Sequence, residues 1–126
     1  MKTNYKLAIA LVAGAAIGGA AIQGLHAQAK PKAYIVTESD ILDAAAAAAY
    51  SPRSQAAQKA AGGRSFRTTG KVTTVVGTPP KRVGISEWDN LEQAQAWITS
   101  EGRKGLNTER EKAIKIVRQY IVESAN

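Results

Sequence analysis

The sequence of 126 residues contains no cysteine. Disulfide bonds are therefore excluded, as are thiol nucleophiles, cysteine-ligated zinc and iron–sulfur clusters. A lipid anchor attached to a cysteine is excluded for the same reason. The stability of the folded chain must come from packing and hydrogen bonding.

Histidine is almost as scarce, because His26 is the only one. It lies in an N-terminal segment that we expect to be removed, which leaves the rest of the chain without histidine. This absence excludes histidine-based catalysis, the commonest transition-metal ligand and a serine triad. We expect no metal site and no cofactor, so any chemistry must use carboxylates, tyrosines and arginines.

The one long apolar run lies near the N-terminus. Lys2 and Lys6 precede an apolar stretch over residues 7–22, which is shorter than the roughly 20 residues of a membrane-spanning helix. A small-x-small cleavage site follows and ends at Ala29, with a poorer alternative that ends at Ala27. These features are typical of a secretion signal, and an uncleaved membrane anchor is the alternative.

We therefore predict a signal peptide over residues 1–29 and a single mature domain over residues 30–126. The expected location is the bacterial periplasm or the medium, with no membrane contact after cleavage. The formal net charge is +7, and removal of Lys2 and Lys6 lowers it to +5. The basic residues are scattered and form no long run, so we expect no nucleic-acid partner.

The alanine-rich stretch in the first half of the domain predicts a helix over residues 44–61. Asp40 or Asp43 is the expected N-cap. A proline inside a helix costs about 3 kcal/mol, so we expect a kink or break at Pro52. The two glycines at 62–63 predict a left-handed C-terminal stop.

Segments rich in β-branched and aromatic residues predict four strands, at residues 33–39, 64–77, 82–88 and 114–123. Gly70 is expected to form a bend or bulge in the second. Simple alternation places Tyr34, Val36 and Glu38 on one face of the first strand. In the last strand it places these residues on one face: Ile114, Ile116, Arg118, Tyr120 and Val122.

A second helix is predicted after Asp89 or Asn90, one of which caps it. Its apolar stripe consists of Leu91, Ala94, Trp97 and Ile98. Gly102 and Gly105 are expected to break it, before a short helix over residues 107–112.

The predicted order is strand, helix, strand, strand, helix, strand, which is the β-α-β-β-α-β order of an α+β ferredoxin-like fold with an antiparallel sheet. Two helices cover only one face of such a sheet. The other face carries apolar and aromatic side chains and needs a cover, for which a second copy of the sheet is the simplest candidate. We therefore expect a homodimer.

Three stretches resemble a known family: "AYIVTE", "GGRSFRTTGK" and "PPKRVGISEWDNLEQAQAWITS". Together they are similar to the domain of unknown function 1330 family, and the similarity extends over residues 33–123. The resemblance implies a dimeric α+β barrel in which two ferredoxin-like sheets face each other. It implies no established activity. The alanine-rich first helix and the irregular stretch at residues 102–108 depart from the family pattern.

Arg64 is a candidate to hold a ligand carboxylate through a bidentate contact. Glu38 and Glu87 are weak candidates for a catalytic base, since a carboxylate that faces an apolar barrel has a raised pKa. The alternative for Arg64 is an ion pair with Glu87 or Glu38, or a solvated position at the strand end. The alternative for the two glutamates is a salt bridge to Arg64, Arg67 or Arg118. A surface pair between Arg64 and Glu87 would count against a site built from them.

Aromatic side chains supply the other candidates. Tyr34, Tyr50 and Tyr120 are candidates to line a ligand cleft, although a buried tyrosine with a satisfied hydroxyl is commoner. Trp88 ends a strand, where we expect it to be half exposed and available to a ligand or a dimer partner. Trp97 lies on the helix stripe and is expected in the core.

The leading hypothesis is a small exported homodimer that binds a small acidic or aromatic ligand in a cleft. The first alternative is a cofactor-independent enzyme of the α+β barrel type, similar to monooxygenases or isomerases, in which Glu87 and Arg64 abstract a proton next to a carbonyl. This alternative rests on fold analogy. The second alternative is a structural or interaction protein of the envelope.

Overall fold

Four strands form one antiparallel sheet in the order β2-β3-β1-β4. They are β1 (Ala33–Ile41), β2 (Arg64–Ser65), β3 (Arg82–Trp88) and β4 (Ile114–Glu123). The computed structural model describes residues 30–66, 68 and 70–125, so the predicted signal segment lies outside the described residues. The strand order and the connections confirm the ferredoxin-like α+β fold.

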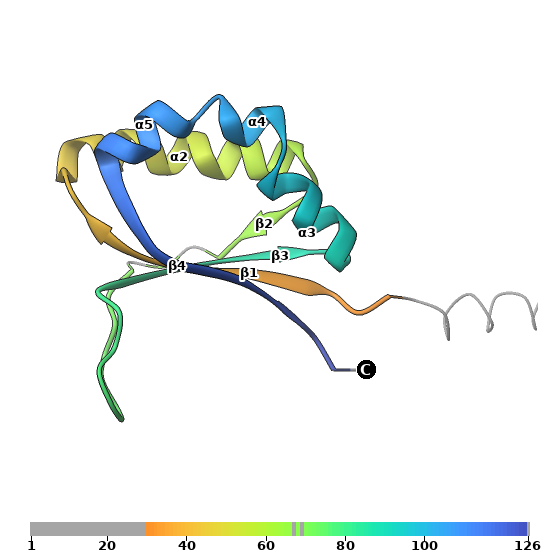
Figure 1. Ribbon diagram of the computed structural model, residues 1–126, viewed down its shortest axis with the longest axis horizontal. Helices are drawn as coiled ribbons and strands as arrows, with labels where there is room; N and C mark the ends of the chain where they lie inside the picture. Colours follow the sequence, from red (N-terminus) through yellow and green to blue (C-terminus); the bar gives the residue numbers. More distant parts are fainter. Residues whose placement is uncertain (1–29, 67, 69, 126) are drawn as a thin grey trace, which may run out of the picture. The chain divides into compact units, whose positions relative to one another are not determined.

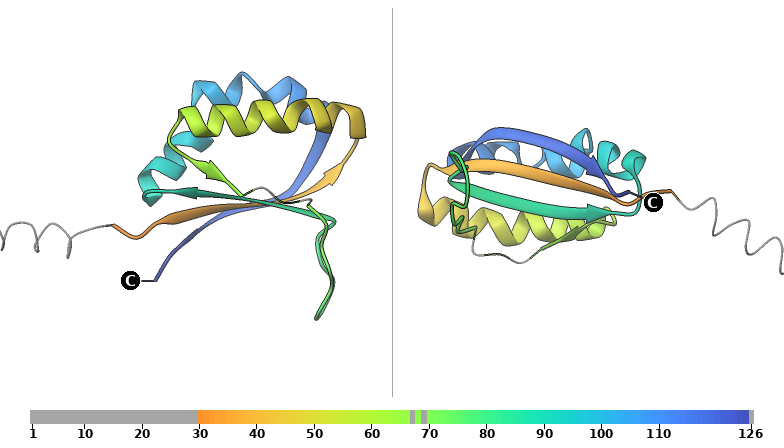
Figure 2. Two further views of the ribbon diagram at one scale, coloured as in Figure 1. Left: turned by 180° about the vertical axis from the view of Figure 1, so that it is seen from behind. Right: turned by 90° about the horizontal axis from the view of Figure 1, so that it is seen from below.

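All helices of the described chain lie on one face of this sheet (Figures 1 and 2). The long helix α2 (Ala44–Ala60) follows β1, and three shorter helices connect β3 to β4: α3 (Leu91–Ile98), α4 (Glu101–Lys104) and α5 (Asn107–Ala113). The opposite face of the sheet carries no helix formed by the described residues.

Helix α2 continues through Pro52, so the expected break is wrong. Proline removes one backbone donor from the helix, but the flanking alanines are the best helix formers. The hydroxyl of Ser51 also donates to the carbonyl of Ala47 at 2.9 Å. Asp43 is the N-cap, accepting from the backbone N–H of Ala46 at 2.8 Å.

The second strand is much shorter than predicted, since β2 covers two residues and not residues 64–77. Phe66 adds one more backbone hydrogen bond, to the carbonyl of Ile85 at 2.9 Å. Gly70 and Gly77 then adopt positive φ values of 73° and 77°, which turn the chain out of the extended path that a strand requires. Residues 70–81, hereafter the arm, leave the sheet instead.

The main core lies between the sheet and α3, and it joins two tryptophans to small residues. Ala33, Ala94 and Trp88 are almost fully buried, and the rings of Trp88 and Trp97 stack with centroids 5.8 Å apart. Trp97 is thus in the core, as predicted. Trp88 is only 1% exposed, so the expectation of a half-exposed tryptophan is wrong: it points to the helix side and not to solvent.

A β-bulge in β4 also corrects the predicted side-chain pattern. Glu38 pairs with Arg118 but the next residue of β1 pairs with Ile116, which leaves Val117 as the extra residue. A bulge reverses the alternation of faces beyond it. Ile114 therefore packs on the helix side, with Ile116 against the same cluster, while Arg118 lies beside Glu38. The five residues predicted on one face of β4 are divided between two.

The Trp88 ring leaves no room beside Gly63, which yields a test of the core. A Cβ on Gly63 would lie 2.5 Å from Trp88 Cζ2, so Gly63→Ala must displace the ring, at a cost of about 1–3 kcal/mol. Gly84→Ala is the control, because nothing lies within 4 Å of its Cβ position. Removal of a strand glycine raises stability by up to about 1 kcal/mol. Urea unfolding, followed by tryptophan fluorescence, measures the free energy of unfolding of both variants. Equal changes in the two variants would contradict this description of the core.

Candidate functional site

Apart from Tyr50, which lies on α2, the uncovered face of the sheet carries five of the six candidate residues that the sequence singled out. Strand register places Tyr34 opposite Glu87, Arg64 opposite Glu87, and Glu38 opposite Arg118, and Tyr120 lies on the same face as Glu38 by alternation. The sixth, Trp88, is on the helix side in the core. The strand register therefore brings these five candidates together on one surface.

The carboxylate of Glu87 is already occupied by three partners. Arg64 and Lys32 form ion pairs with it, the latter at 2.9 Å, and the hydroxyl of Tyr34 donates to it at 3.2 Å. The Arg64 side chain is 69% exposed, and the Tyr34 ring stacks on Phe66 with centroids 6.5 Å apart. A surface pair between Arg64 and Glu87 is the arrangement that counts against a ligand site made from these two residues.

Glu38 is held in the same way at the other end of the uncovered face. Arg118 donates to both carboxylate oxygens, with the shortest contact at 2.6 Å, and the Glu38 side chain is 8% exposed. These hydrogen bonds, with smaller contributions from the charge of Arg118 and from Tyr120, hold the pKa of Glu38 below its ordinary value in spite of burial. The predicted raised pKa is therefore wrong, and Glu38 is a poor base. Burial first, and Glu38 second, raise the pKa of Tyr120.

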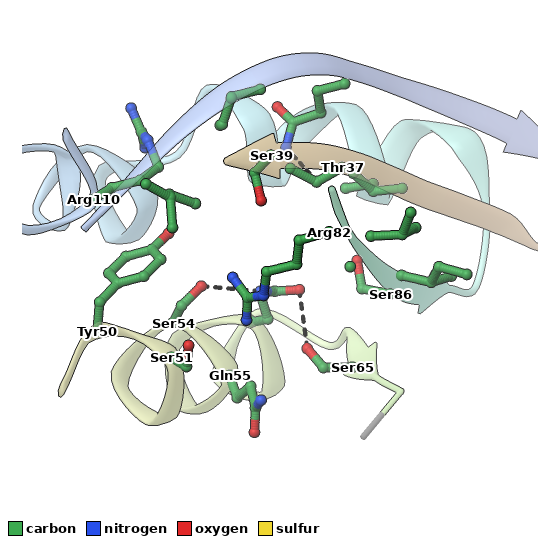
Figure 3. A pocket seen from close by; sticks show the side chains of 18 of the residues that line it. Thr37, Ser39, Tyr50, Ser51, Ser54, Gln55, Ser65, Arg82, Ser86 and Arg110 are labelled. Atoms are coloured by element: carbon green, nitrogen blue, oxygen red, sulfur yellow. Dashed lines mark hydrogen bonds between the residues drawn. The ribbon is translucent and has the colours of Figure 1, made fainter. Parts of the chain in front are cut away.

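A cavity of about 140 Å³ lies on the opposite, helix-covered side of the sheet, beneath α2 (Figure 3). Most of its polar lining consists of hydroxyl and amide groups. These come from Thr37, Ser39, Tyr50, Ser51, Ser54, Gln55, Gln58, Ser65, Thr68, Ser86 and Gln119. Some are tied together: Gln58 donates to Ser54 at 3.1 Å and accepts from Ser65 at 3.2 Å.

The cavity is also cationic. Its lining includes Arg82, Arg103 and Arg110 but no aspartate or glutamate. Arg103 donates to the carbonyl of Ile98 at 3.2 Å and to Gln119 at 2.9 Å. Burial, and secondly the neighbouring charge of Arg110, lower the pKa of Arg103. Positive charge thus accumulates here without an acidic counterion in the wall.

Like Arg110, whose buried Nη1 has no hydrogen-bond partner, Arg82 is a cavity arginine with no side-chain partner among the described residues. It is the first residue of β3 and pairs with Ser39, which directs both side chains to the helix side. Figure 3 shows the Arg82 side chain reaching from the sheet toward α2. Gly70 lies directly against it, since a Cβ on that glycine would be 2.8 Å from Arg82 Cγ. A partly buried guanidinium without a carboxylate is a strong donor to a bound anion.

Sequence reasoning missed Arg82 and most of the cavity wall, although one signal was present. Ser51, Ser54, Gln55 and Gln58 are spaced i, i+3, i+4 and i+7 on α2. That spacing defines a helix face, and this one is polar and faces the sheet. Of the residues singled out, Tyr50 lines the cavity, as does Trp97, which was expected in the core.

Two further features, a metal-binding cluster and a membrane-spanning helix, are absent from the described residues 30–66, 68 and 70–125. No group of three or more histidine, cysteine or acidic side chains there is placed to hold a metal ion. None of the helices in this part of the chain is long and apolar enough to cross a membrane.

The fold and the two faces of the sheet define an α+β protein of the ferredoxin-like class. The chain belongs to the family described as domain of unknown function DUF1330, which it matches over residues 32–125. This assignment confirms the resemblance noted in the sequence. A comparison with curated proteins finds no match.

Solved structures show the same fold. A protein of unknown function from Rhodopseudomonas palustris is similar with a TM-score of 0.61 and 13% identity, over 84% of this chain and 92% of that one. A methylated form of that protein matches with a TM-score of 0.59 and 13% identity, over 84% and 90% of the two chains. At this identity the likeness concerns the fold alone.

The ion pair between Glu38 and Arg118 predicts a specific pH dependence. A carboxylate with a lowered folded pKa stabilises the protein above its unfolded pKa, about 4.3, and the contribution is lost as the pH falls through the folded value. Glu38→Gln should therefore lower the unfolding midpoint most at neutral pH. The difference from the natural protein should shrink below about pH 4. Urea unfolding from pH 7 to pH 3 measures it, with the exposed Glu111→Gln as control; a difference independent of pH would contradict the role of the charge.

Proposed function

We propose that this protein is an exported homodimer that binds a small acidic ligand in the cavity beneath α2. The observation that carries the proposal is Arg82, a partly buried cation without a carboxylate partner, in a polar cavity whose lining includes no acidic residue. Export rests on the predicted signal over residues 1–29. The periplasm or the medium is the proposed location.

The chemistry of the lining favours an acid over a plain aromatic ligand. Hydroxyl, amide and guanidinium groups lose hydrogen bonds to water when an apolar ring covers them, and that loss is costly. A carboxylate instead accepts charge-assisted hydrogen bonds from Arg82 and neutral ones from groups such as Ser54. The size of the cavity, about 140 Å³, is close to the ~150 Å³ that accepts benzene in an apolar protein interior. A ligand of about six heavy atoms, such as a short carboxylic acid, fits that size.

An enzymatic function has less support. A cofactor-independent proton abstraction requires a carboxylate base near the ligand. Glu38 and Glu87 lie on the uncovered face and are engaged by Arg118 and Arg64, and the cavity lining contains neither. An envelope interaction protein remains the alternative if no ligand is bound.

The dimer part of the proposal rests on the uncovered face of the sheet. Its aromatic and aliphatic side chains include Phe66, Tyr120 and Val122, which are 50%, 45% and 48% exposed. Contiguous apolar surface of this kind is typical of an interaction site. A second copy of the same face covers it symmetrically, and the internally paired charges of Glu38 and Glu87 need no partner across the interface.

Ligand binding is tested by thermal shift of the purified protein with acetate, succinate and benzoate. We expect an acid that binds in the cavity to raise the melting temperature, whereas the neutral amide of the same acid leaves the melting temperature unchanged. Arg82→Gln should weaken binding about 10- to 100-fold, because a hydrogen bond to a charged group contributes about 1.5–3 kcal/mol.

Arg53→Gln is the matched control for Arg82→Gln. Arg53 lies on α2 but pairs with Glu109 and is not among the cavity residues, so binding should persist. The proposal fails if no acid produces a shift, or if both variants lose binding equally.

Dimerisation is tested by size-exclusion chromatography with light scattering. We expect a mass of twice that of residues 30–126. Val36→Lys introduces a charge at the middle of the uncovered face and should give a monomer. Ala56→Lys, at an exposed position of α2, should leave the dimer intact. A monomeric natural protein at micromolar concentration would contradict the proposal.

A further inference from the structure

The arm, residues 70–81, carries the most exposed large apolar side chains of the described chain. Val75 is 91% exposed and Val76 is 90% exposed. Both precede Gly77, whose φ of 77° forms the turn. Adjacent valines in solvent are unfavourable, at roughly 25 cal/mol for each Å² of apolar surface that a partner would cover. No part of the described chain covers them.

The arm projects on the uncovered side of the sheet. Figures 1 and 2 show it leaving the end of the sheet and extending away from the helices. The tip valines are therefore presented on the same side as the apolar uncovered face. A partner that stacks on that face lies beside the arm.

The length of the arm matches this arrangement. Six residues, from Gly70 to Val75, span up to about 20 Å when extended, at about 3.3 Å per residue. Two sheets packed face to face lie about 10 Å apart. The tip is thus able to pass the space between stacked sheets and to reach the body of the second copy.

The sequence of the arm supports a paired state. Residues 72–76 read Val-Thr-Thr-Val-Val, a run of β-branched residues that favours extended, paired backbone. In the described chain this run belongs to no strand. A partner strand from a second copy would satisfy its strand propensity.

We infer that the arm of each copy clasps the second copy, with Val75 and Val76 buried against it. This inference rests on the homodimer of the proposed function and deepens it, because it assigns a part of the interface outside the stacked sheets. The basic residues near the ends of the arm, Lys71 and Lys81, make an anionic membrane the competing occupant. The position of the arm beside the uncovered face favours the second copy.

The first experiment compares the double variants Val75→Ser/Val76→Ser and Thr73→Ser/Thr74→Ser. Both alter the same exposed arm, but only the first removes the apolar tip. We expect the first to weaken the dimer at least about tenfold in a sedimentation dilution series and the second to leave it unchanged. Far-UV circular dichroism should be the same for both.

The second experiment uses the absence of cysteine, which makes Val76→Cys a unique attachment point for a benzophenone cross-linker. Mixed ¹⁴N- and ¹⁵N-labelled chains distinguish the products by mass spectrometry. We expect cross-links between differently labelled chains. If the dimer is stable but every cross-link joins two positions of the same chain, the clasp is contradicted and the dimer is not.

Two other results would also contradict the clasp. A protein that is monomeric at all concentrations overturns both the dimer and the clasp. If the Val75→Ser/Val76→Ser variant keeps its dimer affinity but loses co-sedimentation with phosphatidylglycerol vesicles, the arm contacts a membrane and the inference is wrong.

Discussion

The stack of Trp88 on Trp97 sets the spacing between the helices and the sheet. These rings fill one end of the interlayer, and small residues such as Gly63, Ala33 and Ala94 close around them. In the middle of α2, before the second cluster around Ala47, the helix presents short polar side chains to the sheet, including Ser51 and Ser54. Such side chains are too small to fill a space whose width the tryptophans maintain. The cavity therefore results from the unequal sizes of the side chains that pack between the helices and the sheet.

The bulge at Val117 gives the two faces of the sheet different chemistry. It directs Ile114 toward the helices and Arg118 toward Glu38 on the uncovered face. Acidic groups are neutralised on that face by arginines and a lysine. On the helix side, Arg82 and Arg103 have no acidic neighbour in the cavity wall. The cavity wall on the helix side thus lacks negative charge, and the cavity favours an anion.

The element order, the caps at Asp43 and Asn90, and the last strand were predictable because each depends on local sequence. The features that failed depend on tertiary context. Helix α2 continues through Pro52 because its flanking residues outweigh one lost hydrogen bond. The strand expected at residues 64–77 is β-forming by composition, but a strand requires a neighbour, and within the described chain the arm has none.

For the candidate site too, the local sequence predicted the residue types, whereas their pairing depends on the strand register. Arg64, Glu38 and Glu87 were recognised as charged groups at strand ends, and the structure does place them on one surface. Whether a charged group is free or paired depends on the residue opposite it, which only the register determines. Arg118 is the last β4 residue in the regular register and lies opposite Glu38, directly before the bulge, and a bulge has no clear signature in the β4 sequence. Arg82 was overlooked for the converse reason: its significance lies in the absence of an acidic neighbour.

Gly70 connects the two functional proposals physically. Its positive φ begins the arm, and its lack of a side chain lets the backbone lie against Arg82. An L-residue with a side chain would be strained in this conformation and would also press on the guanidinium stem. The same residue therefore starts the segment that extends toward a second copy and forms the support behind the cation of the cavity. The position of Arg82, and hence the geometry offered to an acid, depends on where the root of the arm lies.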